Sequence, residues 1–316
     1  MFYLKRRIKK LMNNRVYTIS EEDVSERIDK FLTAECDDLS RAYLQKIIEK
    51  GNVLVNDKVV KSNYKLRLND LVLLSIDEPE ELDIPAEDIP LDIIYEDNDV
   101  ILINKPKGMV VHPAAGHFTG TLVNALLFHC KDSLSSINGV LRPGIVHRID
   151  MDTTGVIVVC KNDIAHRSLA EQLKDHSITR KYNAIVYHSM SEEDGTVNKP
   201  IGRHPNDRKK MAITPGGGRS AVTHYRVIEG LSSRYTHIEC QLETGRTHQI
   251  RVHMASINHP LLGDEVYGPK NPPIKNIQGQ ALHARVLGFI HPRTDEYVEF
   301  EAPLPDYFED LLRKLR

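Results

Sequence analysis

Residues 147–155 read HRIDMDTTG, and the chain continues directly into VIVVC at residues 156–160. The apolar run is typical of a buried strand, so the first stretch places charged side chains at the entrance of that strand. A charge in such a place needs either a partner or a chemical function. These residues alone leave two interpretations open: a turn in which Asp150 and Thr153 cap backbone amides, or part of a functional site.

The composition is that of a globular protein. The chain has 316 residues, of which 41% are hydrophobic and 27% charged, and we expect one large and one small domain. No uncharged apolar segment approaches the roughly 20 residues of a membrane helix, and the first residues lack the apolar stretch of a secretory signal. We therefore expect a cytoplasmic protein with no membrane partner. The four cysteines form no Cys-x-x-Cys pair and there is no His-Glu-x-x-His motif, so we expect neither disulfides nor a metal site.

The formal net charge of −2 hides two opposite regions. From Asp77 to Asp99 the chain has eleven acidic residues, three prolines and no lysine or arginine. This composition resists helix and sheet, and we interpret residues 77–90 as a linker. Without these acids the rest of the chain carries a net charge of +9, which suits a polyanionic partner. Residues 1–14 hold lysines and arginines but no acid, and we interpret them as a basic arm that can contact phosphates.

Two short helices are predicted before the linker. Residues 26–32 have apolar side chains at helical spacing, and Ser40 can cap a second helix over residues 41–50 that Gly51 ends. Basic residues recur between the apolar positions of this region, which predicts a solvated basic face. They are Arg41, Lys46, Lys50, Lys58, Lys61 and Lys65.

A small sheet should follow these helices. Residues 52–60 predict a hairpin that turns at Asn56 and Asp57, and residues 70–74 predict a further strand. The expected order is therefore helix, helix and small sheet.

This first region resembles the alpha-L RNA-binding module, which was first seen in a small-subunit ribosomal protein. The resemblance rests on RIDKFL at 27–32, LSR at 39–41 and GNVLVN at 51–56, and it covers about residues 25–76. We assign residues 15–76 to this module. The resemblance implies that the second helix and the basic residues of the hairpin bind structured RNA through its backbone and shape.

Strands are predicted again after the linker. Residues 93–95 and 100–104 read as two strands, and KPKG at 105–108 ends the second. Further along, residues 180–187 and 241–253 join basic or aromatic side chains to strands. None of these segments alone predicts a reaction.

Together, five motifs resemble the RluA/RluD-like family of RNA pseudouridine synthases. They are NKPKG at 104–108, HRID at 147–150, KYNA at 181–184, TGRTHQIR at 244–251 and HPLLGD at 259–264. The likeness runs from about residue 91 to the end, so we assign residues 91–316 to the catalytic domain. It implies an α+β fold with a mixed, largely antiparallel central sheet, preceded by a small α/β RNA-binding domain.

The chemistry of this family calls for a carboxylate. Pseudouridine forms when the bond from the base nitrogen to the ribose breaks, the base rotates, and its carbon 5 joins the same sugar carbon. A carboxylate can attack the sugar as a nucleophile, or act as the base of an elimination route. The resemblance gives this role to Asp150 and names Arg251 as the guanidinium that keeps it ionised. For Asp152 we expect a structural role in the turn with Thr153 and Thr154.

Other site residues also come from the resemblance. Tyr182 is expected to stack on the base and to move the carbon 5 proton, against the alternative of plain core packing. Arg148 is expected to fill the gap left by a flipped nucleotide or to hold that nucleotide. Further RNA contacts are expected at His147, Arg246 and His248 and, in the basic segment 203–219, at Arg203 and Arg208.

The sequence therefore predicts a cofactor-free, monomeric RNA pseudouridine synthase that acts on large-subunit (23S-type) ribosomal RNA or on an assembly intermediate. Two alternatives stay open: a transfer-RNA pseudouridine synthase, and a non-catalytic RNA-binding or ribosome-assembly protein. A kinase is excluded because the motifs for phosphate and magnesium are missing. A glycosidase would show two working carboxylates.

Overall fold

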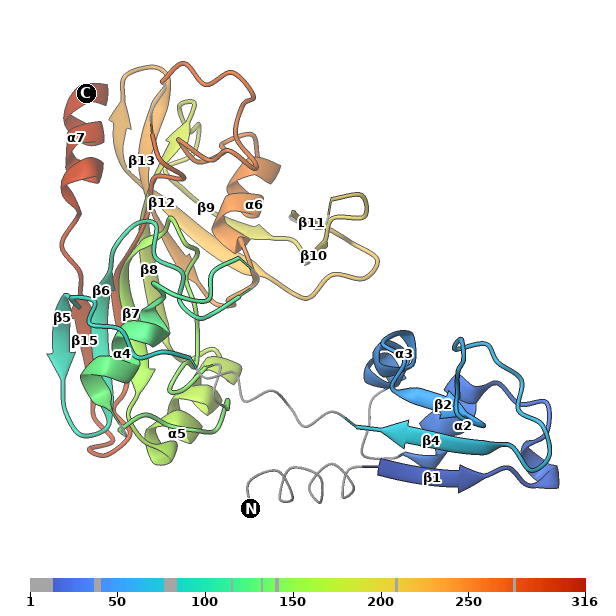
Figure 1. The fold of residues 1–316 in the computed structure, drawn as a ribbon. Coiled ribbons are helices and arrows are strands. Elements are labelled where there is room, and N and C mark those ends of the chain that lie inside the picture. Colours follow the sequence, from blue (N-terminus) through green and yellow to red (C-terminus); the bar gives the residue numbers. More distant parts are fainter. Residues whose placement is uncertain are drawn as a thin grey trace. The chain divides into compact units, whose positions relative to one another are not determined.

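The chain folds into two compact units that divide after Leu82 (Figure 1). The computed structural model describes residues 14–36, 41–76, 84–114, 116–131, 133–139, 142–207, 210–274 and 277–316. Within these ranges no helix is both long and apolar enough to cross a membrane. The predicted basic arm falls outside them except for its last residue, and so does Ser40.

The first unit packs two helices against a four-stranded antiparallel sheet. The helices are α2 (Ile28–Glu35) and α3 (Arg41–Glu49), after a short η1 (Glu21–Asp23). The sheet order is β1-β4-β2-β3, made by β1 (Asn14–Thr18), β4 (Leu71–Ser75), β2 (Val53–Val55) and β3 (Lys58–Val59). The predicted helix, helix and sheet are confirmed. β1 was not predicted, because its short sequence NRVYT becomes a strand only by pairing with the distant β4.

The hairpin turn of this unit follows from two residues. Asn56 and Asp57 connect β2 to β3 with φ angles of 49° and 64°. A two-residue hairpin loop needs positive φ at both positions to match the twist of its strands, and Asn and Asp tolerate this conformation. Gly51, with φ 81°, follows the end of α3 as predicted.

One face of α3 is buried and the other is exposed. Leu44, Ile47 and Ile48 contribute to the core of the first unit, at the spacing of one helical face. Lys46 and Lys50 are therefore exposed, as the predicted basic face requires.

The second unit is built on a nine-stranded sheet. The order is β5-β6-β7-β14-β8-β13-β12-β9, with β15 paired to β14. Its strands are β5 (Ile93–Glu96), β6 (Val100–Lys105), β7 (Thr154–Cys160), β8 (Thr179–Tyr187), β9 (Asp194–Asn198), β12 (Val222–Leu231), β13 (Tyr235–Leu242), β14 (Leu282–Ile290) and β15 (Tyr297–Glu301). Among the described strands only β7 and β14 pair in parallel, so the predicted mixed and largely antiparallel α+β fold is confirmed. A separate two-stranded sheet joins β10 (Ile201–Arg203) and β11 (Met211–Ile213).

Helices cover this sheet. They are α4 (Leu122–Cys130), α5 (Asp163–Lys174), α6 (Gln249–Ser256) and α7 (Asp306–Leu315). Successive residues of β7 belong to different apolar clusters: Val156 and Val158 share one with α5 and α6, while Ile157 and Val159 share one with α4. Because side chains alternate along a strand, β7 is buried on both faces, which explains its continuous apolar run. The last helix packs on the core through one apolar face, as predicted.

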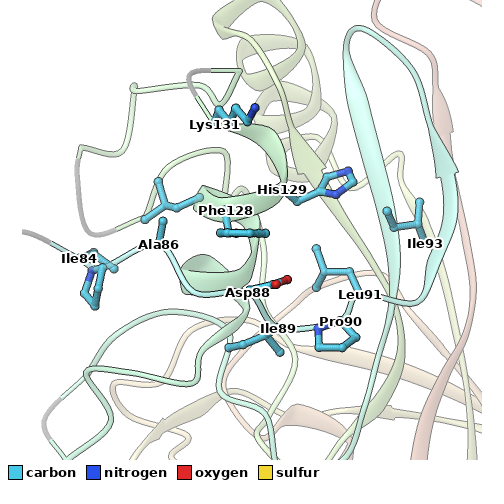
Figure 2. A pocket seen from close by; sticks show the side chains of 12 residues that line it. Ile84, Ala86, Asp88, Ile89, Pro90, Leu91, Ile93, Phe128, His129 and Lys131 are labelled. Carbon is cyan, nitrogen blue, oxygen red and sulfur yellow. The ribbon is translucent and has the colours of Figure 1, made fainter.

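Part of the acidic segment packs on α4. Residues 84–90 form neither helix nor strand, and the amide of Asn124 donates to the Pro85 carbonyl at 2.8 Å. With β5 and the end of α4 they border a groove of about 970 Å³, which Phe128 and His129 help to line (Figure 2). This groove contains none of the predicted site residues, so cavity size alone does not locate the site.

Gly155 allows the parallel pairing of β7 with β14. It lies opposite Ala284 in the strand register and has a φ of 108°, a conformation that side chains disfavour. A β-carbon at this position would overlap the backbone of Ala284. The final glycine of the HRIDMDTTG stretch is thus required by the close approach of two strands.

We expect Gly155→Ala to destabilise the second unit by about 2 kcal/mol or more, because it adds both a clash and an unfavourable φ. Differential scanning calorimetry should show a lower melting temperature for this unit. Gly230→Ala on β12 is the matched control, since a β-carbon there meets no atom within 4 Å. Equal melting temperatures for the two variants would contradict the assigned role of Gly155.

Candidate active site

The loop that leads into β7 is held by backbone hydrogen bonds. The Met151 carbonyl accepts from Gly108 N and from Lys105 Nζ, each at 3.0 Å. Thr153 N donates to the Asp150 carbonyl at 3.1 Å, so a turn is present here. The NKPKG motif therefore fixes the backbone directly after Asp150.

Lys105 is fully buried beside this loop. Burial lowers the pKa of Lys105 to about 7, although the charges of Asp152 and Asp150 act to raise it. Asp152 accepts no hydrogen bond from Thr153 or Thr154 among the described residues, and its Oδ1 has no hydrogen-bond partner there. Asp152 instead compensates buried positive charge.

Arg251 joins two carboxylates. Its Nη1 lies 2.9 Å from Asp150 Oδ2, and its Nε and Nη2 lie 2.7 and 2.9 Å from the two oxygens of Asp264. Burial disfavours the charged guanidinium, but the hydrogen bonds and charges of Asp264 and Asp150 outweigh it and raise the pKa of Arg251. Arg251 is thus a fixed positive charge in contact with Asp150.

Arg251 comes from helix α6, whereas the sequence suggested a segment joined to a strand. β13 ends at Leu242 and a turn separates it from α6. The bidentate partner Asp264 is itself fixed, because its Oδ1 accepts backbone N–H groups from Val266 and Tyr267 at 2.9 and 3.0 Å. Three chain segments thereby determine the position of one guanidinium.

His248 lies on the other side of Asp150. It caps α6 in a left-handed conformation with a φ of 56°, and its Nε2 is 3.9 Å from Asp150 Oδ1. Its Nδ1 lies 2.9 Å from the Tyr267 hydroxyl, whose oxygen accepts from Met211 N. Burial lowers the pKa of His248, with Asp150 acting in the opposite direction, which favours the neutral imidazole.

Gln249 holds the backbone turn between β13 and α6. Its side-chain oxygen accepts from Arg246 N and from the Thr244 hydroxyl, and its amide donates to the Val222 carbonyl. The side chain of Arg246 donates to the carbonyl of Ser220 at 2.9 Å. The TGRTHQIR motif therefore forms one rigid element.

Tyr182 supplies an aromatic wall beside Asp150. It is 8% exposed and lies in β8, in the same apolar cluster as Ile149 and Leu282. Burial raises the pKa of Tyr182, Arg180 lowers it and Asp150 raises it. These residues form one side of a pocket suited to a flat, partly polar ring.

Six of the predicted site residues line this pocket: Arg148, Asp150, Tyr182, Arg246, His248 and Arg251. Arg148 is exposed, and no carboxylate of the described residues forms an ion pair with it. Residues from three separate motifs thus meet at one place.

The remaining predicted residues lie elsewhere. His147 Nε2 accepts from Val158 N at 3.1 Å, and burial lowers the pKa of His147 to about 3, so its ring supports β7 rather than facing the pocket. Arg203 is exposed on β10 and does not line the pocket. Lys46 and Lys50 belong to the first unit. The Arg41 side chain and Arg208 lie outside the described residues.

Four residues of the site had no predicted role. Asp264 and Lys105 stood in quoted motifs, but nothing in their spacing showed which groups they contact. Tyr267 is the hydrogen-bond partner of His248, and Arg180 is buried beside Tyr182. Their common signal is a polar side chain buried next to a site residue, which only the fold reveals.

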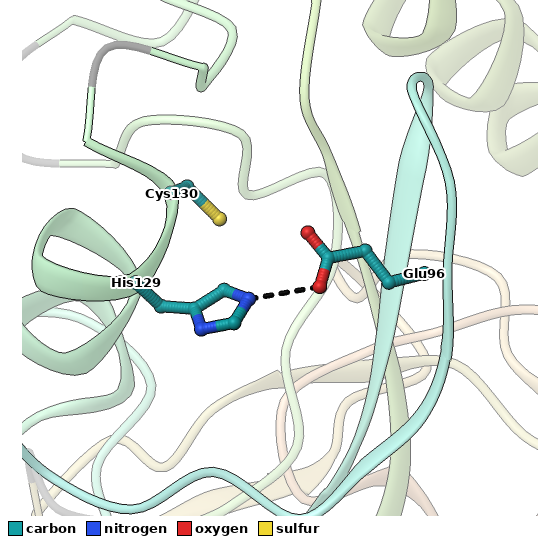
Figure 3. Close-up of side chains that lie close together, drawn as sticks. All are labelled: Glu96, His129 and Cys130. Atoms are coloured by element: carbon teal, nitrogen blue, oxygen red, sulfur yellow. Dashed lines mark hydrogen bonds and ion pairs between the residues drawn. The ribbon is translucent and has the colours of Figure 1, made fainter.

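Metal-ligand side chains come together away from this pocket. Glu96, His129 and Cys130 form one such group, in which His129 Nε2 lies 2.8 Å from Glu96 (Figure 3). The other oxygen of Glu96 accepts from Lys161 Nζ at 2.7 Å, so both of its oxygens are engaged. A second group, Asp97, Asp99 and His291, is likewise joined by hydrogen bonds and ion pairs, with Arg293. We therefore interpret both groups as ion-pair networks around the turn between β5 and β6.

Comparison with known proteins identifies both units. A family model described as RNA pseudouridylate synthase matches residues 99–256, and a model described as S4 domain matches residues 26–72. An uncharacterized RNA pseudouridine synthase of Bacillus subtilis, YlyB, is 56% identical over 305 residues, which cover 96% of this chain and 99% of that protein. The ribosomal large subunit pseudouridine synthase D of Zymomonas mobilis is 47% identical over 311 residues, covering 94% and 96% of the two chains. The solved structure of human RNA pseudouridylate synthase domain containing 1 has a TM-score of 0.56 and 25% identity, and covers 75% of this chain and 98% of that one.

We expect Arg251→Met to destabilise the second unit by about 3–5 kcal/mol, because it leaves the fully buried Asp264 carboxylate without its counter-ion. Urea denaturation should show this loss, and adding Asp264→Leu should restore part of it. Arg226→Met is the control, since its ion pair with Glu239 is exposed and should contribute less than about 1 kcal/mol. A loss no larger than that of the control would show that the buried pair does not organise the site.

Proposed function

Since the chain belongs to the RNA pseudouridylate synthase family, we propose that it isomerises specific uridines of large-subunit ribosomal RNA, with Asp150 as the nucleophile. The observation that carries this proposal is the pairing of Asp150 with Arg251 in a pocket that Tyr182 lines. The family is one of isomerases that act on uridine in RNA. The S4 domain before the catalytic unit supports RNA as the partner.

The geometry of Asp150 supports its role as nucleophile at the anomeric carbon of the ribose. Its Oδ2 is bound by Arg251, while Oδ1 lies 3.9 Å from His248 and forms no closer ion pair among the described residues. The side chain is 20% exposed, so an oxygen is accessible from the pocket. Attack by this oxygen splits the isomerisation into two displacements at the same carbon. The alternative, removal of a neighbouring sugar proton by Asp150, would use the same carboxylate.

Tyr182 is proposed to stack on the uracil ring and to move the carbon 5 proton. The apolar residues Ile149, Leu242 and Leu282 line the same pocket and suit the faces of a planar base. A base stacked in an RNA helix cannot reach this pocket, so the target nucleotide must flip out of the stack. Arg148 is exposed at the pocket and is placed to hold the flipped nucleotide or to fill its gap.

Basic residues on both units are proposed to bind the RNA backbone. Arg246 lines the pocket, and Lys46 and Lys50 are exposed on the first unit. We propose residues 15–76 as the RNA-binding module and residues 91–316 as the catalytic domain. The relatives named ribosomal large subunit pseudouridine synthase D support the choice of ribosomal RNA over transfer RNA.

We further propose that the enzyme acts as a monomer and without a cofactor. Isomerisation changes neither the oxidation state nor the number of phosphates, and it releases no part of the base. Its needs are a nucleophile and a group that moves one proton, and residues of the pocket supply both.

We expect Asp150→Asn to abolish isomerisation with unchanged RNA affinity, because the amide has nearly the same size but is not nucleophilic. The assay is carbodiimide primer extension on ribosomal RNA from cells that lack the gene. Asp152→Asn is the matched control and should keep turnover. Turnover by Asp150→Asn would contradict the assignment of Asp150 as the nucleophile. Modification of transfer RNA alone would change the substrate class, and no product with either RNA would favour a non-catalytic RNA-binding protein.

We expect the double variant Lys46→Gln/Lys50→Gln to bind ribosomal RNA more weakly and with less salt dependence. Loss of two phosphate contacts should reduce the slope of log affinity against log salt by up to about 2. Fluorescence anisotropy at several salt concentrations measures this slope. Lys314→Gln at the end of α7 is the control, and an unchanged slope in the double variant would exclude these lysines from the RNA interface.

A further inference from the structure

Arg180 is a buried cation that pairs with no carboxylate of the described residues. The residue is 6% exposed, and its Nη2 donates to the Glu243 carbonyl at 2.9 Å. Its Nε has no hydrogen-bond partner, and no ion pair of Arg180 is found within the described ranges. Burying a guanidinium with so few partners is unfavourable, so this side chain needs a functional explanation.

The fold places Arg180 next to the pocket but outside it. Arg180 and Tyr182 are two positions apart on β8, so their side chains point to the same face of the sheet. Arg180 does not line the pocket, which keeps it from direct contact with the RNA backbone. The electrostatic interaction between the two side chains acts on both: Tyr182 favours the charged form of Arg180, and Arg180 favours the ionised form of Tyr182.

A second observation ties Arg180 to the TGRTHQIR motif. Its Nη1 occupies the space that a β-carbon on Gly245 would need. The glycine of this motif therefore leaves room for the guanidinium. Through Glu243 the same guanidinium holds the turn that carries Arg246.

We propose that Arg180 is a positioning residue that stabilises negative charge on the Tyr182 oxygen while the carbon 5 proton of the target base is moved. This inference rests on the proposed role of Tyr182 in the isomerisation. It adds a function for a buried residue that contacts neither the substrate nor Asp150.

A single tyrosine can carry out both proton transfers. Once carbon 5 has bonded to the sugar, the base has an N1=C6 double bond, and carbon 5 still bears its hydrogen. Tyr182 gives its proton to N1 and becomes a tyrosinate. The tyrosinate then takes the carbon 5 proton, the C–H electron pair forms the C5=C6 double bond, and the C6=N1 π pair returns to N1. Tyr182 is regenerated, and no proton is gained or lost.

Arg180 is needed during the short life of this tyrosinate. Burial opposes a negative charge on Tyr182, and the nearby Asp150 opposes it further. A fixed guanidinium that the fold has already desolvated can offset both effects without reorganisation at the moment of reaction. N1 and carbon 5 flank carbon 6, so one hydroxyl near that edge of the ring can serve both atoms.

The test compares Arg180→Met with Arg180→Lys in single-turnover reactions of the full-length protein. The RNA is a ribosomal transcript made with uridine or with 5-deuterouridine. We expect Arg180→Met to react about 10- to 100-fold more slowly, to show a primary isotope effect, and to bind RNA with unchanged affinity. Arg180→Lys keeps the charge and should lose less rate. Arg285→Met on the neighbouring β14 is the control, because Arg285 also donates to a backbone carbonyl.

A slow Arg180→Met variant without an isotope effect would show that Arg180 only supports the turn at Glu243, and this would overturn the proposal. An unchanged rate would do the same. If Arg180→Met does not fold, the isotope effect of Arg180→Lys decides in the same way. Absence of product with the wild-type protein would instead contradict the proposed function, so the two failures are distinguishable.

Discussion

The Arg251 guanidinium lies between two carboxylates that are far apart in the sequence, and the geometry of the site depends on it. Asp264 binds two of its nitrogens and fixes its plane, which leaves Nη1 for Asp150. Asp264 is fully buried and held by two backbone amides, so the guanidinium cannot relax toward solvent. Asp150 consequently meets a positive charge whose position was determined by folding, before any substrate binds.

The sheet brings the other parts of the site to this charge. β7 and β14 pair in parallel at Gly155 and Ala284, where a larger residue would not fit. That contact fixes the start of β7, where the loop with Asp150 lies. Tyr182 belongs to β8, which pairs with the opposite edge of β14. The turn before α6 is rigid because Gln249 satisfies its polar groups. Separate motifs thus become one pocket through backbone constraints.

Much of this fold could be predicted from local patterns. A continuous apolar run predicted β7, and Asn56 with Asp57 predicted the hairpin turn, because each depends on neighbours in sequence. The motifs also led to the residues that line the pocket. The partnership of Arg251 with Asp264 could not be derived in this way, nor could the burial of Arg180. Both depend on which strands and helices meet. The sequence did not predict a helix for Arg251, because only a short, polar turn separates α6 from the preceding strand.

The charges near the pocket are paired in a way that the net charge of the chain does not show. Near the pocket, the charges of buried Lys105 and half-buried Lys107 offset that of Asp152, and Arg251 is shared by Asp150 and Asp264. The arginines at the pocket, Arg148 and Arg246, have no carboxylate partner in the described structure. Their charge is therefore available to a polyanion, while Asp150 and Asp264 share the charge of Arg251. This separation lets one carboxylate work inside a site that still attracts RNA phosphates.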